Sequence, residues 1–222
     1  MNVLVIGASR GIGLEFVRQY RAAGDAVSAT ARDDAGLERL RAIGAAALRL
    51  DVTADDCAAA LAAQLGDAAF DIVVVNAGVY GPKTDGLQAP AADEFDRVMH
   101  TNVLGPMRVL APVAGALART GARIAVMSSR MGSIGLRAGA NGWLYRASKA
   151  ALNSVLKDAS TALAGRATCV ALHPGWVRTD MGGAQADLDV ERSVADLRRV
   201  LARLGPGDNG RFLDHDGTEI AW

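Results

Sequence analysis

The sequence predicts an α/β fold in which a parallel sheet carries helices on both faces. Short apolar segments alternate along the chain with longer segments of helical periodicity, which is the pattern of βαβ units. The apolar segments are continuously hydrophobic, as in Asp71–Val75, and such segments are typical of strands buried on both faces. A glycine-rich turn, Gly7–Gly13, separates the first apolar segment from the first helical one. Together these observations favour a doubly wound sheet in three layers.

The individual elements follow from local patterns of apolar, β-branched and turn-forming residues. We expect seven strands, at Asn2–Ile6, Ala26–Ala31, Ala46–Leu50, Asp71–Val75, Arg123–Met127, Thr168–Leu172 and Gly210–Leu213. We expect helices at Gly11–Ala23, Asp34–Ile43, Ala54–Leu65, Asp93–Thr120, Trp143–Leu163 and Val190–Leu204. Gly24 stands directly after the first helix, as is common at helix ends. No repeat or linker interrupts the alternation, so we expect one domain over residues 1–222.

The composition excludes several classes of protein. The chain has 24 Lys and Arg against 24 Asp and Glu, and its formal net charge is zero. It therefore lacks the positive field that attracts nucleic acids or anionic membranes, and we expect neither as a partner. Half of the 222 residues are hydrophobic, and 44 residues are Ala. These figures exclude a disordered chain, a collagen-like chain and a disulfide scaffold.

The cysteines and the N-terminus favour a cytoplasmic protein. Cys57 and Cys169 lie far apart in apolar segments, where buried free thiols are expected, as in a reducing compartment. No apolar run is long enough to cross a membrane, and the chain enters a strand at once rather than a signal peptide. His100 and His215 are isolated, no cluster has the spacing of metal ligands, and we expect no metal site.

The glycine-rich turn predicts a dinucleotide-binding loop. A turn between a strand and the N-terminus of a helix offers free N–H groups and the positive end of the helix dipole, which suit a pyrophosphate. Glycines in a turn are otherwise often only punctuation. The candidate residues are Gly7, Ser9, Arg10, Gly11, Ile12 and Gly13.

Tyr145 and Lys149 form the motif Tyr-x-x-x-Lys on a predicted helix. Residues four apart share a helix face, so the phenol and the ammonium are expected side by side. A nearby positive charge favours the phenolate and lowers the pKa of the tyrosine, as a proton donor in carbonyl chemistry requires. The alternative is an amphipathic helix on which the two side chains merely stack.

Three further polar residues accompany this motif. Ser129 follows the fifth strand at its carboxyl end, where open α/β sheets bind ligands, unless it is part of a plain Ser-Ser turn. Asn76 ends the fourth strand, where a bare turn is the alternative. Asn102 lies four residues before Pro106, which has no N–H to donate to the Asn102 carbonyl. We therefore expect a kink there and a carbonyl free to hold water, the alternative being a surface Asn.

In this order the motifs resemble the short-chain dehydrogenase/reductase family, from Gly7 to Thr179. The glycine loop has its spacing Gly-x-x-x-Gly-x-Gly, although Ile6 replaces the usual Thr and Val75 replaces the first Asn of Asn-Asn-Ala-Gly. Segments 127–134, 145–153 and 212–217 resemble the C-factor and sniffer-like carbonyl reductase branch. The resemblance implies a Rossmann-type seven-stranded sheet and hydride transfer between a nicotinamide and a carbonyl or alcohol substrate.

The resemblance also implies roles for the motif residues. Tyr145 would exchange the proton, Ser129 would hydrogen-bond the carbonyl, and Lys149 would lower the tyrosine pKa and bind ribose. Asn102 would support a proton relay. The implied cofactor contacts beyond the glycine loop are Asp51, Val52, Asn76, Ala77, Gly78, Tyr145, Lys149, Pro174, Gly175, Val177 and Thr179.

The end of the second strand favours NADPH over NADH. No acid occupies its last positions, Arg32 follows directly, and Arg10 lies in the glycine loop. Two guanidinium groups suit the 2′-phosphate of the cofactor, unless both are solvated surface residues. Asp33 leaves the alternative of a contact to a ribose 2′-OH. Asp51 is either the adenine contact or an N-cap for the helix near Ala54.

Three further expectations concern the function, the assembly and the substrate site. A dinucleotide-binding signalling protein of C-factor type, with little turnover, is the alternative to an enzyme. The long helices Asp93–Thr120 and Trp143–Leu163 pair across a two-fold axis in this family, and Ala147, Ala150 and Ala151 would permit close approach, so we expect a homodimer or homotetramer. The short segment Asp180–Asp189 suggests an open or late-ordering substrate site.

Overall fold

The predicted sheet is present. We obtained a computed structural model that describes residues 1–118 and 120–222. Within these residues seven strands form one sheet in the order β3-β2-β1-β4-β5-β6-β7, and each neighbouring pair is parallel. The strands are β1 (Asn2–Ile6), β2 (Ala26–Ala31), β3 (Ala46–Arg49), β4 (Ile72–Val75), β5 (Ala122–Met127), β6 (Ala167–Leu172) and β7 (Arg211–Leu213).

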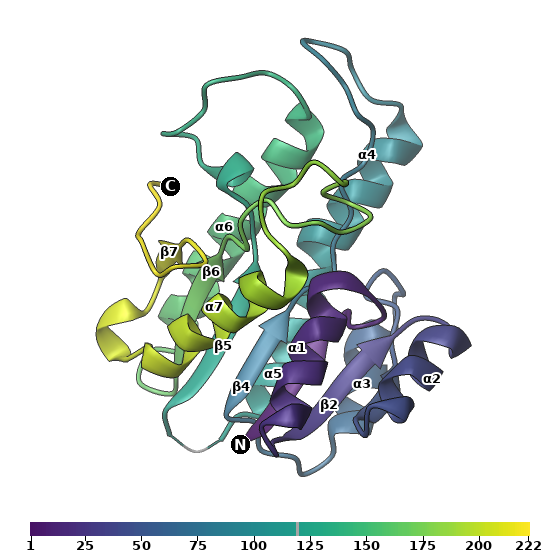
Figure 1. Cartoon of the computed structure of the whole chain (residues 1–222), viewed down its shortest axis with the longest axis vertical. Helices are drawn as coiled ribbons and strands as arrows, with labels where there is room; N and C mark the ends of the chain where they lie inside the picture. Colours follow the sequence, from purple (N-terminus) through teal and green to yellow (C-terminus); the bar gives the residue numbers. More distant parts are fainter. Residues whose placement is uncertain (119) are drawn as a thin grey trace.

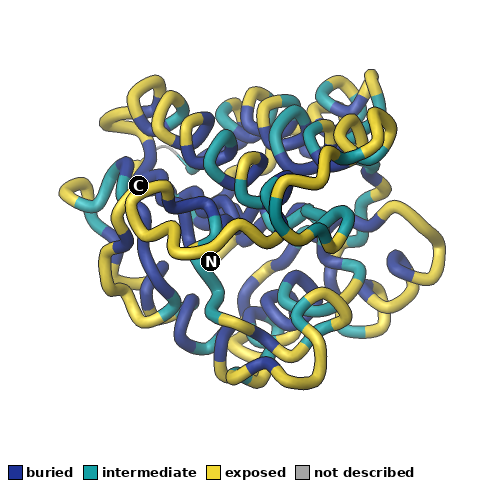
Figure 2. Tube along the Cα trace, turned by 90° about the horizontal axis from the view of Figure 1, so that it is seen from above, coloured by how far each residue is buried: buried dark blue, intermediate teal, exposed yellow. Residues whose placement is uncertain are grey.

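Helices cover both faces of the sheet (Figure 1). They are α1 (Gly11–Ala22), α2 (Asp34–Ala42), α3 (Cys57–Leu65), α4 (Ala92–Met99), α5 (Gly105–Gly115), α6 (Trp143–Ala162) and α7 (Val190–Arg203). Helices α1, α2 and α7 pack on one face through Phe16, Leu40 and Leu197. Helices α3, α5 and α6 pack on the other through Leu61, Val113 and Leu156. Figure 2 shows the consequence, with buried segments in the middle and exposed turns outside.

The long helix expected at Asp93–Thr120 is wrong as one continuous element. The segment instead forms α4, the π-helical turn η1 (His100–Leu104) and α5, which ends at Gly115, and residue 119 lies outside the described residues. The Gly105 N–H donates to the His100 carbonyl, five residues earlier. Pro106 has no N–H for the Asn102 carbonyl, so the irregularity falls where the sequence predicts it.

The helix expected from Ala54 begins later, at Cys57. Asp51 accepts from the Thr53 N–H at 2.9 Å and from the Thr53 hydroxyl at 2.7 Å, which forms a separate turn before the helix. Asp51 is therefore not the N-cap of α3, and the N-cap position belongs to Asp56.

The strand order determines where a ligand can lie. β1 pairs with β2 on one side and with β4 on the other, so the connections after β1 and β4 leave in opposite directions. Such a switch point opens a crevice at the carboxyl edge of the sheet. In the part of the chain that the structure describes, no helix is long and apolar enough to cross a membrane.

Candidate active site

A cavity of about 710 Å³ opens at the carboxyl edge of the sheet. Its walls come from five separate segments: the glycine loop, the loops after β4, β5 and β6, and the first turns of α6. Among the sequence-predicted residues, Ile12, Ser129, Tyr145, Pro174, Gly175, Val177 and Thr179 line it. The fold therefore gathers residues from distant positions of the chain at one place.

Tyr145 is buried at the base of this cavity beside Ser129. Ser129 precedes the short helix η2 (Arg130–Gly132), and its hydroxyl also accepts from the Met131 N–H at 3.2 Å. Burial raises the pKa of Tyr145 to about 12, while a side-chain hydrogen bond with Ser129 acts in the lowering direction. The two side chains expected to meet a carbonyl oxygen thus line the same cavity.

Lys149 lies one helical turn after Tyr145, as the spacing predicts. Its Nζ is 5.7 Å from the centroid of the Tyr145 ring and donates to the Met127 carbonyl at 2.7 Å. Burial lowers the pKa of Lys149 to about 8. The raised pKa of Tyr145 is opposite to the direction expected from the sequence, because burial of the phenol outweighs a lysine at this distance.

Tyr80, in the loop after β4, is a residue that the sequence did not reveal. Its ring stacks on that of Tyr145, with the centroids 4.6 Å apart and the planes at 24°. A Cβ at Gly142 would lie 2.4 Å from the Tyr80 hydroxyl, and Gly142 has a φ of +61°. The glycine just before α6 therefore leaves the space that this stack occupies. No local signal marks Tyr80, because its partner is 65 positions away.

Asn102 is buried, and its side chain is fully engaged. Its Oδ1 accepts from the Val79 N–H at 2.8 Å, and its Nδ2 donates to the Val79 carbonyl at 2.8 Å and to the Ser148 hydroxyl at 2.9 Å. These bonds hold η1 against the loop after β4 and against α6. The side chain is thus a structural clamp between these three segments. The surface alternative is wrong.

The glycine loop fits the approach of a pyrophosphate. Arg10 is the N-cap position of α1, and in the described chain this helix has neither a side-chain cap nor an acid in its first turn. The positive end of the helix is therefore left for an anion from outside the protein. A Cβ at Gly7 would lie 2.7 Å from Ala77, and one at Gly13 would lie 2.3 Å from the Gly7 carbonyl oxygen. Larger residues cannot form this turn.

The segment after β4 supports the glycine loop. Asn76 Nδ2 donates to the Gly7 carbonyl at 2.7 Å, so the bare-turn alternative is wrong. Ala77 packs against Gly7, and Gly78 lies against the polar atoms of two other site residues. A Cβ at Gly78 would be 3.4 Å from both Asn102 Oδ1 and Lys149 Nζ.

The end of β2 carries exposed charged residues beside the glycine loop. Arg10 forms an ion pair with Asp180, and both side chains are largely exposed. Arg32 is exposed, whereas Asp33 caps α2 by accepting from the Gly36 N–H at 2.7 Å. Arg39, which sequence reasoning missed, donates from Nε to the Ser9 carbonyl at 2.9 Å. A third guanidinium therefore stands at this corner.

Asp51 and Val52 lie after β3. The Asp51 carboxylate accepts hydrogen bonds from Thr53 within a tight turn. Burial acts to raise the pKa of Asp51, but the hydrogen bonds from Thr53 and the charge of Arg32 leave this pKa below its usual range. Val52 is buried, and a Cβ at Gly105 would lie 3.0 Å from it. Val52 therefore packs at the N-terminus of α5.

The segment after β6 is firmly held. The Pro174 carbonyl accepts from the Ser193 hydroxyl at 2.6 Å, and Val177 pairs with Leu188. The Thr179 hydroxyl accepts from the Gly182 N–H at 3.1 Å. Gly175 has a φ of +82°, and a Cβ there would lie 2.4 Å from Leu188. The segment Asp180–Asp189 thus packs on the loop that follows β6.

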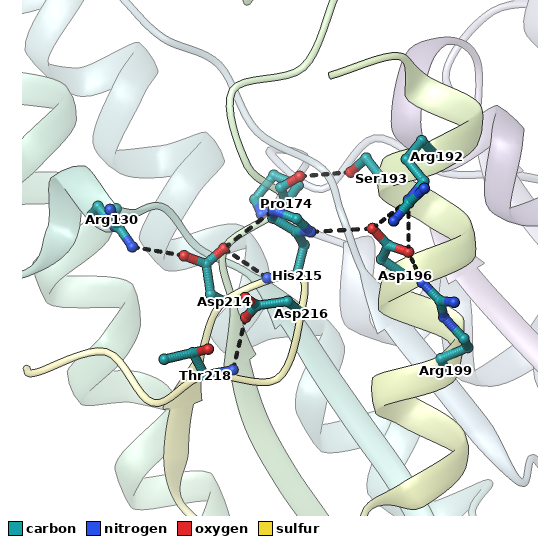
Figure 3. Close-up of polar contacts among 10 residues, drawn as sticks. All are labelled: Arg130, Pro174, Arg192, Ser193, Asp196, Arg199, Asp214, His215, Asp216 and Thr218. Carbon is teal, nitrogen blue, oxygen red and sulfur yellow. Dashed lines mark hydrogen bonds and ion pairs between the residues drawn. The ribbon is translucent and has the colours of Figure 1, made fainter. Parts of the chain in front are cut away.

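A polar network joins Arg130, which lines the cavity, to the segment after β7 and to α7 (Figure 3). Arg130 donates to Asp214 at 2.8 Å, and Asp196 faces His215 Nδ1 at 3.4 Å. His173 lines the cavity, and burial lowers its pKa to about 4, so the imidazole is neutral near pH 7. No group of three or more His, Cys, Asp or Glu residues could hold a metal ion within residues 1–118 and 120–222.

This arrangement of sheet, glycine loop and Ser-Tyr-Lys set is that of a dinucleotide-dependent oxidoreductase. Residues 1–188 match the family model for short chain dehydrogenases. The chain belongs to this family, and it is an NAD(P)-dependent oxidoreductase.

Individual relatives agree with the narrower resemblance. The C-signal protein of Myxococcus xanthus is 41% identical over 159 residues, which cover 68% of this chain and 92% of that protein. A carbonyl reductase from Pseudomonas aeruginosa PAO1, solved in complex with NADP, has a TM-score of 0.88 and 36% identity, with 100% of this chain and 99% of that chain covered. The carbonyl reductase Sniffer of D. melanogaster has a TM-score of 0.89 and 32% identity, with coverages of 100% and 99%. The predicted C-factor and sniffer-like branch is confirmed.

Proposed function

We propose that the chain is an NADPH-dependent carbonyl reductase that works as a single domain. The observation that carries this proposal is that Ser129 and Tyr145 line one cavity, with Lys149 one helical turn from Tyr145. Burying a lysine beside a tyrosine costs folding free energy, and ionisable groups perturbed in this way cluster at functional sites.

The reaction divides between the cofactor and these residues. The nicotinamide supplies hydride when NADPH is bound. Ser129 orients the carbonyl oxygen, and Tyr145 donates its phenol proton to that oxygen. Lys149 holds the ribose, and its positive charge stabilises the phenolate left on Tyr145. The Asn102 carbonyl would hold the water through which Lys149 regains a proton from solvent.

The cofactor is held along the carboxyl edge of the sheet. The N–H groups of Ser9, Arg10, Gly11 and Ile12 would hold the pyrophosphate, with Gly7 and Gly13 permitting its approach. Asn76, Ala77 and Gly78 border the ribose, and Asp51 and Val52 the adenine. Pro174, Gly175, Val177 and Thr179 border the nicotinamide.

Arginines at the end of β2 favour NADPH over NADH. Arg10 and Arg32 would bind the 2′-phosphate, joined by Arg39, which already contacts the glycine loop. The ion pair of Arg10 with Asp180 is exposed on both sides, so it costs little to exchange for a phosphate. Asp33 is committed to capping α2, which weakens the NAD alternative.

The direct test is Tyr145→Phe. We expect the variant to bind NADPH as tightly as the wild type but to lose its oxidation with aldehyde and quinone substrates by at least about a hundredfold, because no group then donates the proton. Cofactor binding is followed by fluorescence titration and turnover by absorbance. Undiminished turnover in the variant contradicts the assigned role of Tyr145.

The second candidate function is a signalling protein that binds the dinucleotide with little turnover. It is favoured by the 41% identity to C-signal over 159 residues. A broad carbonyl panel run with NADPH and NADH separates the two functions, since cofactor binding without any turnover supports the signalling function.

Assembly and location are further parts of the proposal. We propose a homodimer or homotetramer in which α6 pairs through its small residues Ala147, Ala150 and Ala151. A monomeric mass measured by light scattering would contradict this assembly. A cytoplasmic location is supported by two buried free cysteines, Cys57 and Cys169.

A further inference from the structure

The charged residues that line the active-site cavity are all cationic. Lys83, Arg130 and Arg146 belong to its described walls, whereas no Asp or Glu of the described chain does. His173 also lines it but is neutral near pH 7, because burial lowers its pKa to about 4. A protein with no net charge thus gathers positively charged side chains around its site.

One of these three cations is already neutralised. Arg130 points away toward the polar network behind the cavity, where its Nη2 donates to Asp214 Oδ2 at 2.8 Å (Figure 3). The Asp214 side chain is 12% exposed, so this ion pair is partly shielded from water. The remaining charge belongs to Lys83 and Arg146.

Arg146 is oriented by neutral groups alone. Its Nε donates to the Asn141 carbonyl at 2.9 Å and its Nη2 to the Asn141 side chain at 3.0 Å. Within the described residues no carboxylate pairs with Arg146. A guanidinium has five N–H donors, so several stay available while its position is set by the loop.

Lys83 reaches the same cavity from another segment. It is exposed in the loop after β4, next to Thr84, whose carbonyl accepts from the Gly142 N–H at 2.9 Å. This bond joins the Lys83 loop to the start of α6, where Arg146 lies. Like Arg146, Lys83 has no ion-pair partner in the described part of the chain.

Flat and apolar side chains complete the walls. The Tyr80 ring, stacked on Tyr145, lies beside the catalytic end, and Leu136, Trp176 and Met181 line the cavity although each is about half exposed. An apolar surface next to two unpaired cations is complementary to a molecule with an apolar body and an acidic end.

We propose that the carbonyl substrate of this enzyme carries a carboxylate, or a similar acidic group, which Arg146 binds with help from Lys83, while its apolar body lies against Tyr80 and Trp176. The proposal rests on the reductase function and specifies its substrate class. Arg146 acts on binding and not on the proton transfer, so its loss affects the acidic substrate alone.

The test compares two aldehydes that differ at one end, 4-carboxybenzaldehyde and methyl 4-formylbenzoate. For the wild type with NADPH we expect kcat/KM for the acid to exceed that for the ester. Arg146→Gln should reduce kcat/KM for the acid by about ten- to a hundredfold, because KM for the acid rises. It should leave kcat/KM for the ester within about twofold of the wild-type value. Lys83→Gln, at an exposed site, should act in the same direction more weakly.

Controls separate a local contact from overall charge. Arg203→Gln removes one positive charge from an exposed position on α7 and should leave kcat/KM unchanged for both aldehydes. Arg146→Lys keeps the charge but loses the fork and should restore part of the preference for the acid. If Arg146→Gln lowers kcat/KM equally for both aldehydes, or for neither, the acidic-group site is refuted. Turnover of the ester would still support the reductase function.

Binding distinguishes failure of this inference from failure of the proposed function. Calorimetry measures the affinity of 4-(hydroxymethyl)benzoate for the wild type and for Arg146→Gln, each in the presence of NADP. Binding that Arg146→Gln abolishes, with neither aldehyde reduced, upholds the acidic-group site and overturns the reductase. Equal binding by both proteins overturns the site.

Discussion

Replacing Lys149 by Met should stabilise the protein while it abolishes carbonyl reduction. Burial lowers the pKa of Lys149 from 10.5 to about 8. This difference corresponds to about 3 kcal/mol of unfavourable free energy for keeping the ammonium charged in the folded state at neutral pH. Loss of the hydrogen bond to the Met127 carbonyl, 2.7 Å long, offsets about 1 kcal/mol of that. We expect Lys149→Met to be more stable by about 2 kcal/mol at pH 7.

The sign of the pH dependence follows from the direction of this pKa. The folded protein binds fewer protons than the unfolded chain between about pH 8 and 10.5, so the cost of the charge is full below pH 8 and disappears as the pH rises. The advantage of Lys149→Met should therefore shrink by about 1 kcal/mol between pH 7 and pH 9. Taking the difference between the two proteins cancels the titration of Cys169 and the tyrosines.

Urea unfolding of both proteins at pH 7, 8 and 9 measures these quantities. Fluorescence and circular dichroism should give coincident transitions, which justifies the two-state free energies. A variant less stable than the wild type at pH 7, or an advantage that does not change with pH, would refute the claim that Lys149 is held as a strained buried cation.

The other predictions concern the glycine loop and the reaction. Asn76→Ala removes the donor to the Gly7 carbonyl, 2.7 Å away, and should lower the free energy of unfolding by about 1–3 kcal/mol and weaken NADPH binding; unchanged urea midpoint and affinity would contradict it. The reduction rate should fall as the pH rises through about 8, because Lys149 loses its charge while Tyr145 keeps its proton to about pH 12. A pH profile of kcat/KM for a neutral aldehyde checks this. A kcat/KM that does not change up to pH 9.5 would exclude Lys149 as the titrating group.

The strands were predictable because their signal is local. Continuous apolar segments between amphipathic ones place β1 to β7 within a few residues of their observed bounds, since burial on both faces demands such segments. The break of the helix expected at Asp93–Thr120 was predictable only in part. Pro106 marks the irregular turn, but the end at Gly115 depends on packing: the Phe70 N–H, just before β4, donates to the Ala116 carbonyl at 2.8 Å.

The site residues divide in the same way. Tyr145 and Lys149 are recognisable because one helix carries both, and the glycine loop because its residues are contiguous. Tyr80 and Arg39 carry no such mark, since each contacts its partner only after separate segments have been brought together.

The sequence by itself determined the order of strands and helices, the glycine loop and the spacing of Tyr145 and Lys149, because these are properties of neighbouring residues. The tertiary structure decided the electrostatics. Burial at the carboxyl edge of the sheet raises the pKa of Tyr145 to about 12 and lowers that of Lys149 to about 8. It also pairs Arg130 with Asp214 and leaves Arg146 with neutral partners. Desolvation and pairing depend on which segments meet, and that is decided only when the sheet has formed.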